Sequence, residues 1–119
     1  MATIRHFEDL ATWQMARSLC SEIWEISNKG TFATDYGLKN QINRSSGSTM
    51  DNVAEGFGRG GNKEFINFLG ISRGSNDEVR SQLYRAHDRK HISEKEFIDF
   101  KDKLASFIFR LFPEMVTPP

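Results

Sequence analysis

The sequence predicts an all-α protein, an antiparallel four-helix bundle with up-down-up-down topology in which residues 1–119 form a single domain. Four stretches carry apolar residues at intervals of three and four, the spacing that gathers them on one face of a helix. The first proline of the chain is Pro113, so no residue before it removes an amide donor from a helix. The links between the stretches are short, which makes neighbouring helices antiparallel.

The first predicted helix covers about residues 9–28 and buries one apolar face. Its polar end is followed by Gly30, a residue that commonly terminates helices because it tolerates the left-handed conformation. In the link that follows, Phe32 is expected to fold back onto the core. Thr34 or Asp35 is placed to accept a hydrogen bond from the first turn of the second helix.

The second predicted helix covers about residues 36–57 and has smaller side chains along its buried stripe. Small side chains allow a neighbouring helix to approach closely. Gly47, and Gly70 in the third helix, each cost about 1 kcal/mol relative to alanine, so their presence also suggests close helix contact. A glycine-rich run at 56–61 ends the helix and permits a tight turn.

The third and fourth predicted helices cover about residues 62–90 and 94–112. The fourth begins at a capping box, in which Ser93 accepts from a first-turn amide and Glu96 reaches back to the amide of Ser93. Pro113 is expected to end this helix. The first and fourth helices together are expected to supply most of the aromatic core.

The composition argues against export, membrane insertion and metal-dependent folding. Cys20 is the only cysteine, which leaves neither an intramolecular disulfide nor a cysteine pair for zinc. No stretch approaches the ~20 apolar residues that cross a bilayer, and residues 1–10 lack a leader pattern. We therefore expect a cytoplasmic protein with no cofactor, no metal and no membrane contact.

Five polar residues on the second and third predicted helices form a candidate cluster: Asn52, Glu55, Ser75, Asn76 and Glu78. Positions equidistant from Gly60 should face each other across the turn, which pairs Arg44 and Ser45 roughly with Ser75 and Asn76. The favoured interpretation is a buried hydrogen-bond network that fixes the helix register. The alternative is a small-ligand or catalytic site that uses Asn52, Glu55, Asn76 and Glu78.

Other possible sites have weaker support. The glycine-rich run could hold a phosphate, but no strand precedes it and the Lys-Ser/Thr pair of a nucleotide-binding loop is missing. His87 and His91 have the spacing of a metal-ligand pair, yet solvated histidines are favoured at a helix end. Cys20 lies on an apolar stripe, where a buried and inert thiol is usual. No catalytic residue is predicted.

The net charge of the chain is zero, so attraction to nucleic acid has to come from local clusters of basic residues. Residues 36–92 hold the basic excess. A row of guanidinium groups along a helix could follow a nucleic-acid backbone. The alternative is a solvated charged face, because Asp77, Glu78 and Asp88 interrupt the row. The candidate nucleic-acid-binding residues are Arg44, Arg59, Arg73, Arg80 and Arg85.

Several short motifs follow one another along the chain: Phe7-Glu8-Asp9-Leu10 with Trp13-Gln14, Gln41-Ile42, Arg44-Ser45-Ser46, Asn52-Val53-Ala54-Glu55-Gly56-Phe57-Gly58-Arg59, Glu64-Phe65, Phe68-Leu69, Gly74-Ser75, Glu78 and Gln82-Leu83. From about Ile4 to Leu111, this combination resembles the bacterial four-helix-bundle family linked to 23S ribosomal RNA intervening sequences. The resemblance implies a four-helix bundle that assembles into a ring-like homopentamer and has a link to RNA. A related branch, the accessory variability protein of diversity-generating retroelements, is a basic pentamer that binds nucleic acid and a reverse transcriptase.

The sequence therefore favours a non-enzymatic homo-oligomer associated with nucleic acid, either RNA or DNA. Symmetry would multiply a basic face that is weak on one chain. One alternative is a protein-protein scaffolding module whose partner covers an exposed aromatic patch near Trp24 or Phe112. The less favoured alternative is the enzyme or ligand binder built on the polar cluster.

Overall fold

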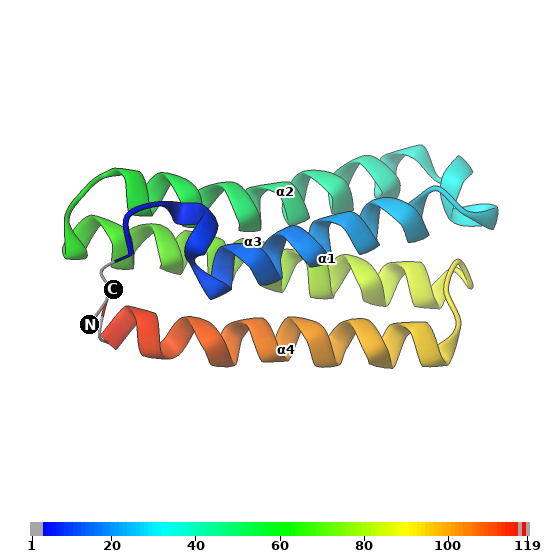
Figure 1. The fold of residues 1–119 in the computed structure, drawn as a ribbon. Coiled ribbons are helices and arrows are strands. Elements are labelled where there is room, and N and C mark those ends of the chain that lie inside the picture. Colours follow the sequence, from blue (N-terminus) through cyan, green and yellow to red (C-terminus); the bar gives the residue numbers. More distant parts are fainter. Residues whose placement is uncertain (1–3, 117, 119) are drawn as a thin grey trace.

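The structure, a computed structural model, describes residues 4–116 and 118 (Figure 1). The described part of the chain contains α-helices and short 3-10 helices and no strand, which confirms the all-α prediction. In chain order the elements are η1 (Phe7–Asp9), α1 (Ala11–Ser27), η2 (Gly30–Thr34), α2 (Tyr36–Gly58), α3 (Asn62–Asp88) and α4 (Glu94–Val116).

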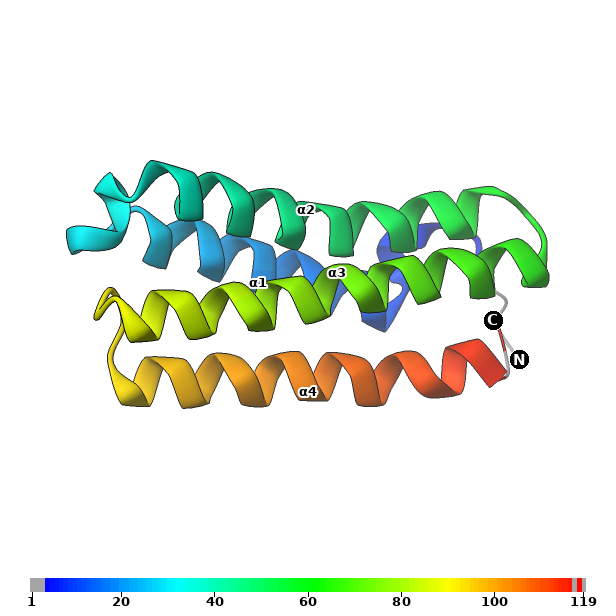
Figure 2. The same cartoon turned by 180° about the vertical axis from the view of Figure 1, so that it is seen from behind.

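The four long helices form an antiparallel bundle with extents of 47 × 22 × 19 Å. Each helix packs against the next along the chain, and α4 packs back against α1. The turn between α2 and α3 lies at the same end as the end of α4, while η2 and the link between α3 and α4 lie at the opposite end (Figures 1 and 2). No helix within residues 4–116 is long and apolar enough to cross a membrane.

The helix starts follow local backbone chemistry. Leu10 is extended (φ −73°, ψ 127°) and separates η1 from α1, so the first long helix begins later than predicted. The side chain of Asp35 accepts from the amide of Leu38 at 3.5 Å, which confirms it as the N-cap of α2. The capping box is also confirmed, because Ser93 and Glu96 exchange backbone-to-side-chain hydrogen bonds of 2.8 and 3.1 Å.

The helix ends differ more from the prediction. Helix α3 stops at Asp88, and Lys90 takes a left-handed φ of 62°. The prediction that Pro113 ends α4 is wrong, because the helix continues to Val116. Proline removes one amide donor near the end of a long helix, and Glu114 on the following turn is buried. Burial of this turn against the rest of the bundle therefore outweighs the local preference of proline.

Most buried side chains of the bundle are apolar, and most of the buried aromatic ones come from α4. Helix α4 supplies Phe97, Phe100 and Phe107, as expected. Helix α1 buries mainly aliphatic side chains such as Ile23, and its aromatic contribution is Trp13, which is partly buried against the core. Phe32 of η2 is fully buried, which confirms that this link folds back onto the bundle.

Helices α2 and α3 approach each other most closely. The hydroxyl of Ser72 donates to the backbone carbonyl of Thr49 at 2.6 Å, a contact that joins the two helices directly. A Cβ atom on Gly56 would lie 2.5 Å from the Cβ of Phe68, so any larger residue at this position would push α2 and α3 apart. Gly47 and Gly70 have open space where a Cβ would stand, so the prediction of close contact at these two glycines is wrong.

Candidate functional site

The polar residues between α2 and α3 form two separate sets of hydrogen bonds. The amide of Asn52 donates to the hydroxyl of Ser48 at 3.0 Å, and this hydroxyl lies 3.0 Å from that of Ser75. Ser45 donates to the carboxylate of Glu78 at 3.4 Å. Ser45 therefore faces Glu78 and not Ser75, so the predicted pairing is wrong by about one helical turn. The two cross-helix pairs, Ser45 with Glu78 and Ser48 with Ser75, are both symmetric about a point just after Gly61.

Two members of the predicted polar cluster take no part in these hydrogen bonds. Glu55 is exposed and pairs with Arg59 at 2.9 Å. Asn76 is buried and donates to the backbone carbonyl of Leu104 on α4 at 3.3 Å. The two carboxylates that an enzyme would use, Glu55 and Glu78, have different partners. This arrangement favours the register-fixing interpretation over a catalytic one.

A small internal cavity lies beside Asn76. Its volume is about 10 Å³, roughly the space of one water molecule, and helices α1 to α4 all contribute to its wall. The Oδ1 atom of Asn76 has no hydrogen-bond partner within the described residues. This cavity is too small to hold an organic substrate between the helices. Its lining residues are Ala16, Leu19, Ile23, Ser46, Thr49, Asn76, Val79 and Leu104.

All five candidate arginines are exposed, but several are engaged with neighbouring side chains. Arg59 lies over the ring of Phe68 at 5.1 Å in addition to its pair with Glu55. Arg80 is 3.9 Å from Asp77, a weak surface pair. Within the described residues, no ion pair involves Arg44, Arg73 or Arg85.

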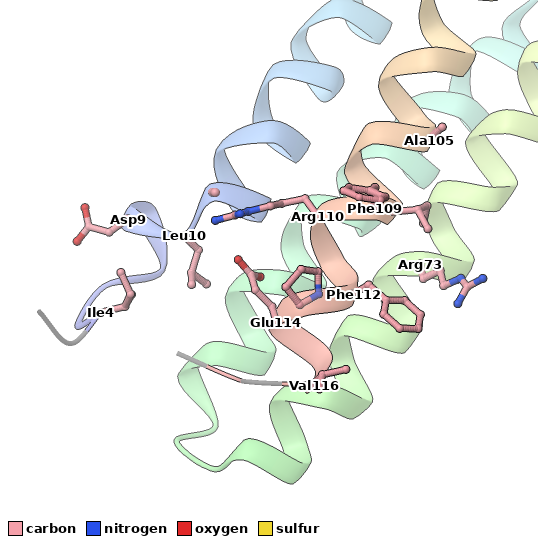
Figure 3. A pocket seen from close by; sticks show the side chains of 13 residues that line it. Ile4, Asp9, Leu10, Arg73, Ala105, Phe109, Arg110, Phe112, Glu114 and Val116 are labelled. Carbon is pink, nitrogen blue, oxygen red and sulfur yellow. The ribbon is translucent and has the colours of Figure 1, made fainter. Parts of the chain in front are cut away.

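The arginines do not form one row along α3. Arg85 donates to Gln41 of α2 at 2.6 Å, which places it on the α2 flank of the helix. Arg73 lies on the other flank, where it shares a groove with Phe112 of α4 (Figure 3). A nucleic acid would therefore meet Arg44 and Arg85 from one side of the bundle and Arg73 from another.

His87 and His91 do not form a metal-ligand pair, because α3 ends before His91. His91 lies 2.9 Å from the carboxylate of Asp35 and 2.8 Å from the hydroxyl of Thr31. Its side chain is only 10% exposed, so the prediction of a solvated histidine is wrong here. The hydrogen bond from His91, with help from Arg89, lowers the pKa of Asp35 to about 2. Across residues 4–116, no group of three His, Cys, Asp or Glu side chains is arranged to hold a metal ion.

A groove of about 950 Å³ opens at the end of α4 (Figure 3). Phe109 and Phe112 lie on the flank of α4 that faces Arg73, and Glu114 lies on the flank that faces Leu10. Glu114 accepts a buried hydrogen bond of 2.7 Å from Thr12. Burial raises the pKa of Glu114, while Thr12 and Arg110 act in the opposite direction. The sequence prediction missed this contact because α4 was expected to end at Pro113.

Replacing Thr12 with valine is expected to lower the free energy of unfolding by about 1–3 kcal/mol near neutral pH. Valine has a similar shape but cannot donate to the buried carboxylate of Glu114. Because the folded-state pKa is raised, the stability from this carboxyl group is present at low pH and lost as pH rises through that pKa. Removing the donor enlarges that loss.

Urea unfolding near pH 4 and near pH 7 measures the effect. The variant Thr12→Ser keeps the hydroxyl, so the difference between its stabilities at the two pH values should resemble that of the wild type. A loss in Thr12→Val that is equal at the two pH values would show that packing, and not the carboxylate, accounts for the change.

The outer face of α4 carries a second apolar stripe, distinct from the stripe that fills the core. We call Ala105, Phe109, Phe112 and Val116 the outer stripe; their spacings of four and three residues place them on one side of the helix. Phe109 is 83% exposed and Phe112 is 59% exposed. Trp24 on α1 is also exposed, so both predicted aromatic positions lie at the surface.

Comparison with known protein families decides the relationship of this chain. Residues 8–111 match the family described as 23S rRNA-intervening sequence protein. The chain belongs to this family. The match runs from α1 through most of α4. It includes the polar residues between α2 and α3 and all five candidate arginines. No curated protein matches the chain in sequence.

The chain is also similar to a solved structure. That structure is a protein of unknown function from the S23 ribosomal protein family of Bacteroides thetaiotaomicron VPI-5482. The TM-score is 0.81, with 17% sequence identity over 89% of this chain and 96% of the other. At that identity the likeness shows the shared four-helix fold.

Proposed function

We propose that this protein is a non-enzymatic helical bundle that self-associates and binds RNA. The outer stripe of α4 is the observation that carries the proposal. The family description supports the link to RNA. The separate engagement of Glu55 and Glu78 supports a role that does not involve catalysis.

Self-association accounts for the outer stripe. The inner face of α4 already supplies core residues such as Phe107, so the fold of one chain does not need a second apolar face on this helix. Burying exposed apolar surface is favourable by about 25 cal/mol per Å². Arg73 lies beside Phe112, and aromatic and arginine side chains are enriched in protein interfaces. Copies of the same chain offer the same stripe, and closed symmetry would cover it in every copy.

The proposed assembly is a homo-oligomer, and the family resemblance implies a pentamer. The competing scaffolding hypothesis places a different protein on the same stripe. The two differ in the behaviour of the purified chain, because only self-association raises its mass above 13.7 kDa in the absence of a partner. Light scattering therefore separates them.

RNA binding by a neutral chain depends on local charge and on repetition. Arg44 of α2 and Arg85 of α3 are exposed, and the contact between Arg85 and Gln41 places Arg85 on the flank of α3 that faces α2. One pair of arginines contributes little, but several copies in one assembly raise the overall affinity through multivalency. Binding of this kind weakens with salt because phosphate contacts release counterions.

Replacing both Arg44 and Arg85 with glutamine is expected to weaken RNA binding and flatten its salt dependence. Because the double variant can no longer neutralise two phosphates, the log-log slope of affinity against salt should fall by about 1.4 for single-stranded RNA. Fluorescence anisotropy with a labelled RNA at several salt concentrations measures both quantities. The control is Arg17→Gln, which removes an exposed arginine from α1 that lies 5.6 Å from the ring of Trp13. Affinity and slope that match the wild type in the double variant would contradict this placement of the RNA surface.

A further inference from the structure

Tyr84, on the flank of α3 that faces α4, has a fixed ring and an exposed surface. We propose that this ring is a stacking platform for an unpaired RNA base. The inference rests on the proposed RNA association and deepens it, because it specifies single-stranded RNA and assigns a base contact. The candidate arginines account for phosphate contacts and leave base contacts unassigned.

Neighbouring side chains of α4 hold the ring of Tyr84 in place. It packs against the ring of Phe97 in a T-shaped arrangement, with centroids 4.8 Å apart and an angle of 78° between planes. The ammonium group of Lys101 lies 3.1 Å from the Tyr84 hydroxyl, 5.0 Å from its ring centre and 4.8 Å from the ring centre of Phe97. Because these contacts already restrict the ring, a base that stacks on it loses little additional side-chain freedom.

The surface of Tyr84 remains available to a ligand. Its exposed fraction is 45%, although Phe97 and Lys101 both contact it. On its other side, Phe97 stacks against His87 with centroids 4.5 Å apart, so the aromatic cluster continues under the surface. Every nucleobase has a π-face, and aromatic platforms beside basic groups are a common way to bind single strands.

The charges around Tyr84 also suit a nucleotide. Lys101 is adjacent, and Arg80 lies one helical turn earlier on α3. Two of the nearby carboxylates have partners, since Asp77 is 3.9 Å from Arg80 and Glu94 is 2.7 Å from His87. A base on the ring would lie close to the ammonium group of Lys101, which is 5.0 Å from the ring centre.

The platform and the outer stripe can act at the same time. Tyr84 faces Phe97 and Lys101 in the first half of α4, whereas the outer stripe occupies the second half, from Ala105 to Val116. In Figure 2 these halves lie toward opposite ends of the bundle. Self-association through the stripe therefore leaves Tyr84 open to RNA.

Unpaired bases are the expected ligand because bases in a duplex are already stacked on their neighbours. The test uses a fluorescently labelled oligouridylate and a labelled RNA duplex, with dissociation constants measured by anisotropy at low salt. Tyr84→Leu removes the ring but keeps an apolar side chain against Phe97, and Tyr84→Phe keeps the ring. Tyr36→Leu is the matched control, because Tyr36 is 67% exposed and has no aromatic or cation contact within the described residues.

The wild type should bind the oligouridylate more tightly than the duplex. Tyr84→Leu should weaken binding of the oligouridylate by about 5- to 150-fold, the usual effect of losing one stacked base. Tyr84→Phe should retain most of the affinity, and Tyr36→Leu should match the wild type. Circular dichroism of each variant checks that the fold is kept.

Two results would overturn the inference in distinguishable ways. If the wild type binds RNA with the expected salt dependence but Tyr84→Leu binds the oligouridylate equally well, the platform is wrong and the proposed function stands. If the wild type binds neither RNA, the proposed RNA association fails and the platform fails with it.

Discussion

Replacing Gly56 with alanine is expected to lower the free energy of unfolding by about 1–3 kcal/mol, the usual cost of overpacking. The new Cβ would lie 2.5 Å from the Cβ of Phe68 and 3.3 Å from its Cγ. The Cβ of Phe68 is fixed to the backbone of α3, so no rotamer change relieves the contact. Helices α2 and α3 would have to separate. This movement would also lengthen the hydrogen bond from the Ser72 hydroxyl to the backbone carbonyl of Thr49.

The matched control is Gly47→Ala on the same helix. No atom lies within 4 Å of a Cβ placed there, so alanine gains its normal helix preference over glycine. We expect the free energy of unfolding to rise by about 0.5–1 kcal/mol. Urea unfolding measures both variants. Stabilisation by alanine at Gly56 as well as at Gly47 would contradict the close contact of α2 and α3.

Replacing Phe109 and Phe112 together with serine is expected to dissociate the proposed assembly into single folded chains. Truncation of an interface anchor typically costs about 2 kcal/mol or more, so the pair should weaken association on the order of a thousandfold. Both side chains are exposed in the single chain, at 83% and 59%, so the bundle itself should lose little stability. Light scattering reports the mass, and circular dichroism reports the fold.

The control for this variant is Trp24→Ser on α1. Trp24 is 60% exposed, similar to Phe112, but it belongs to a different helix face. We expect it to leave the mass unchanged. If Trp24→Ser dissociates the assembly and the double phenylalanine variant does not, the interface lies on α1 and not on α4.

The sequence predicted the fold well because helical periodicity and capping are local signals. The capping box at Ser93 and the cap at Asp35 depend only on residues within three positions of each other. The continuation of α4 past Pro113 could not be predicted locally. It accompanies burial of Glu114 against Thr12, a contact across 102 residues of sequence.

The candidate site was harder to predict because it depends on the register of α2 against α3 and on the side of each helix that a residue occupies. The prediction placed the symmetry point of the α2–α3 turn at Gly60, whereas in the structure it lies just after Gly61. This difference changes which polar residues of α2 and α3 face each other. The presence of a glycine did not by itself indicate close helix contact. A Cβ atom added at Gly56 would clash with Phe68, whereas one added at Gly47 would lie in open space. The outer stripe was visible in the sequence as a set of apolar residues. Only the structure separates it from the stripe that fills the core.

The mass of the wild-type chain in solution tests the central claim, self-association through α4, most directly. Light scattering over a range of concentrations should give a discrete multiple of 13.7 kDa, and the family resemblance predicts five copies. The double replacement of Phe109 and Phe112 should return the mass to that of one chain. A wild-type mass of 13.7 kDa at every concentration would contradict the account.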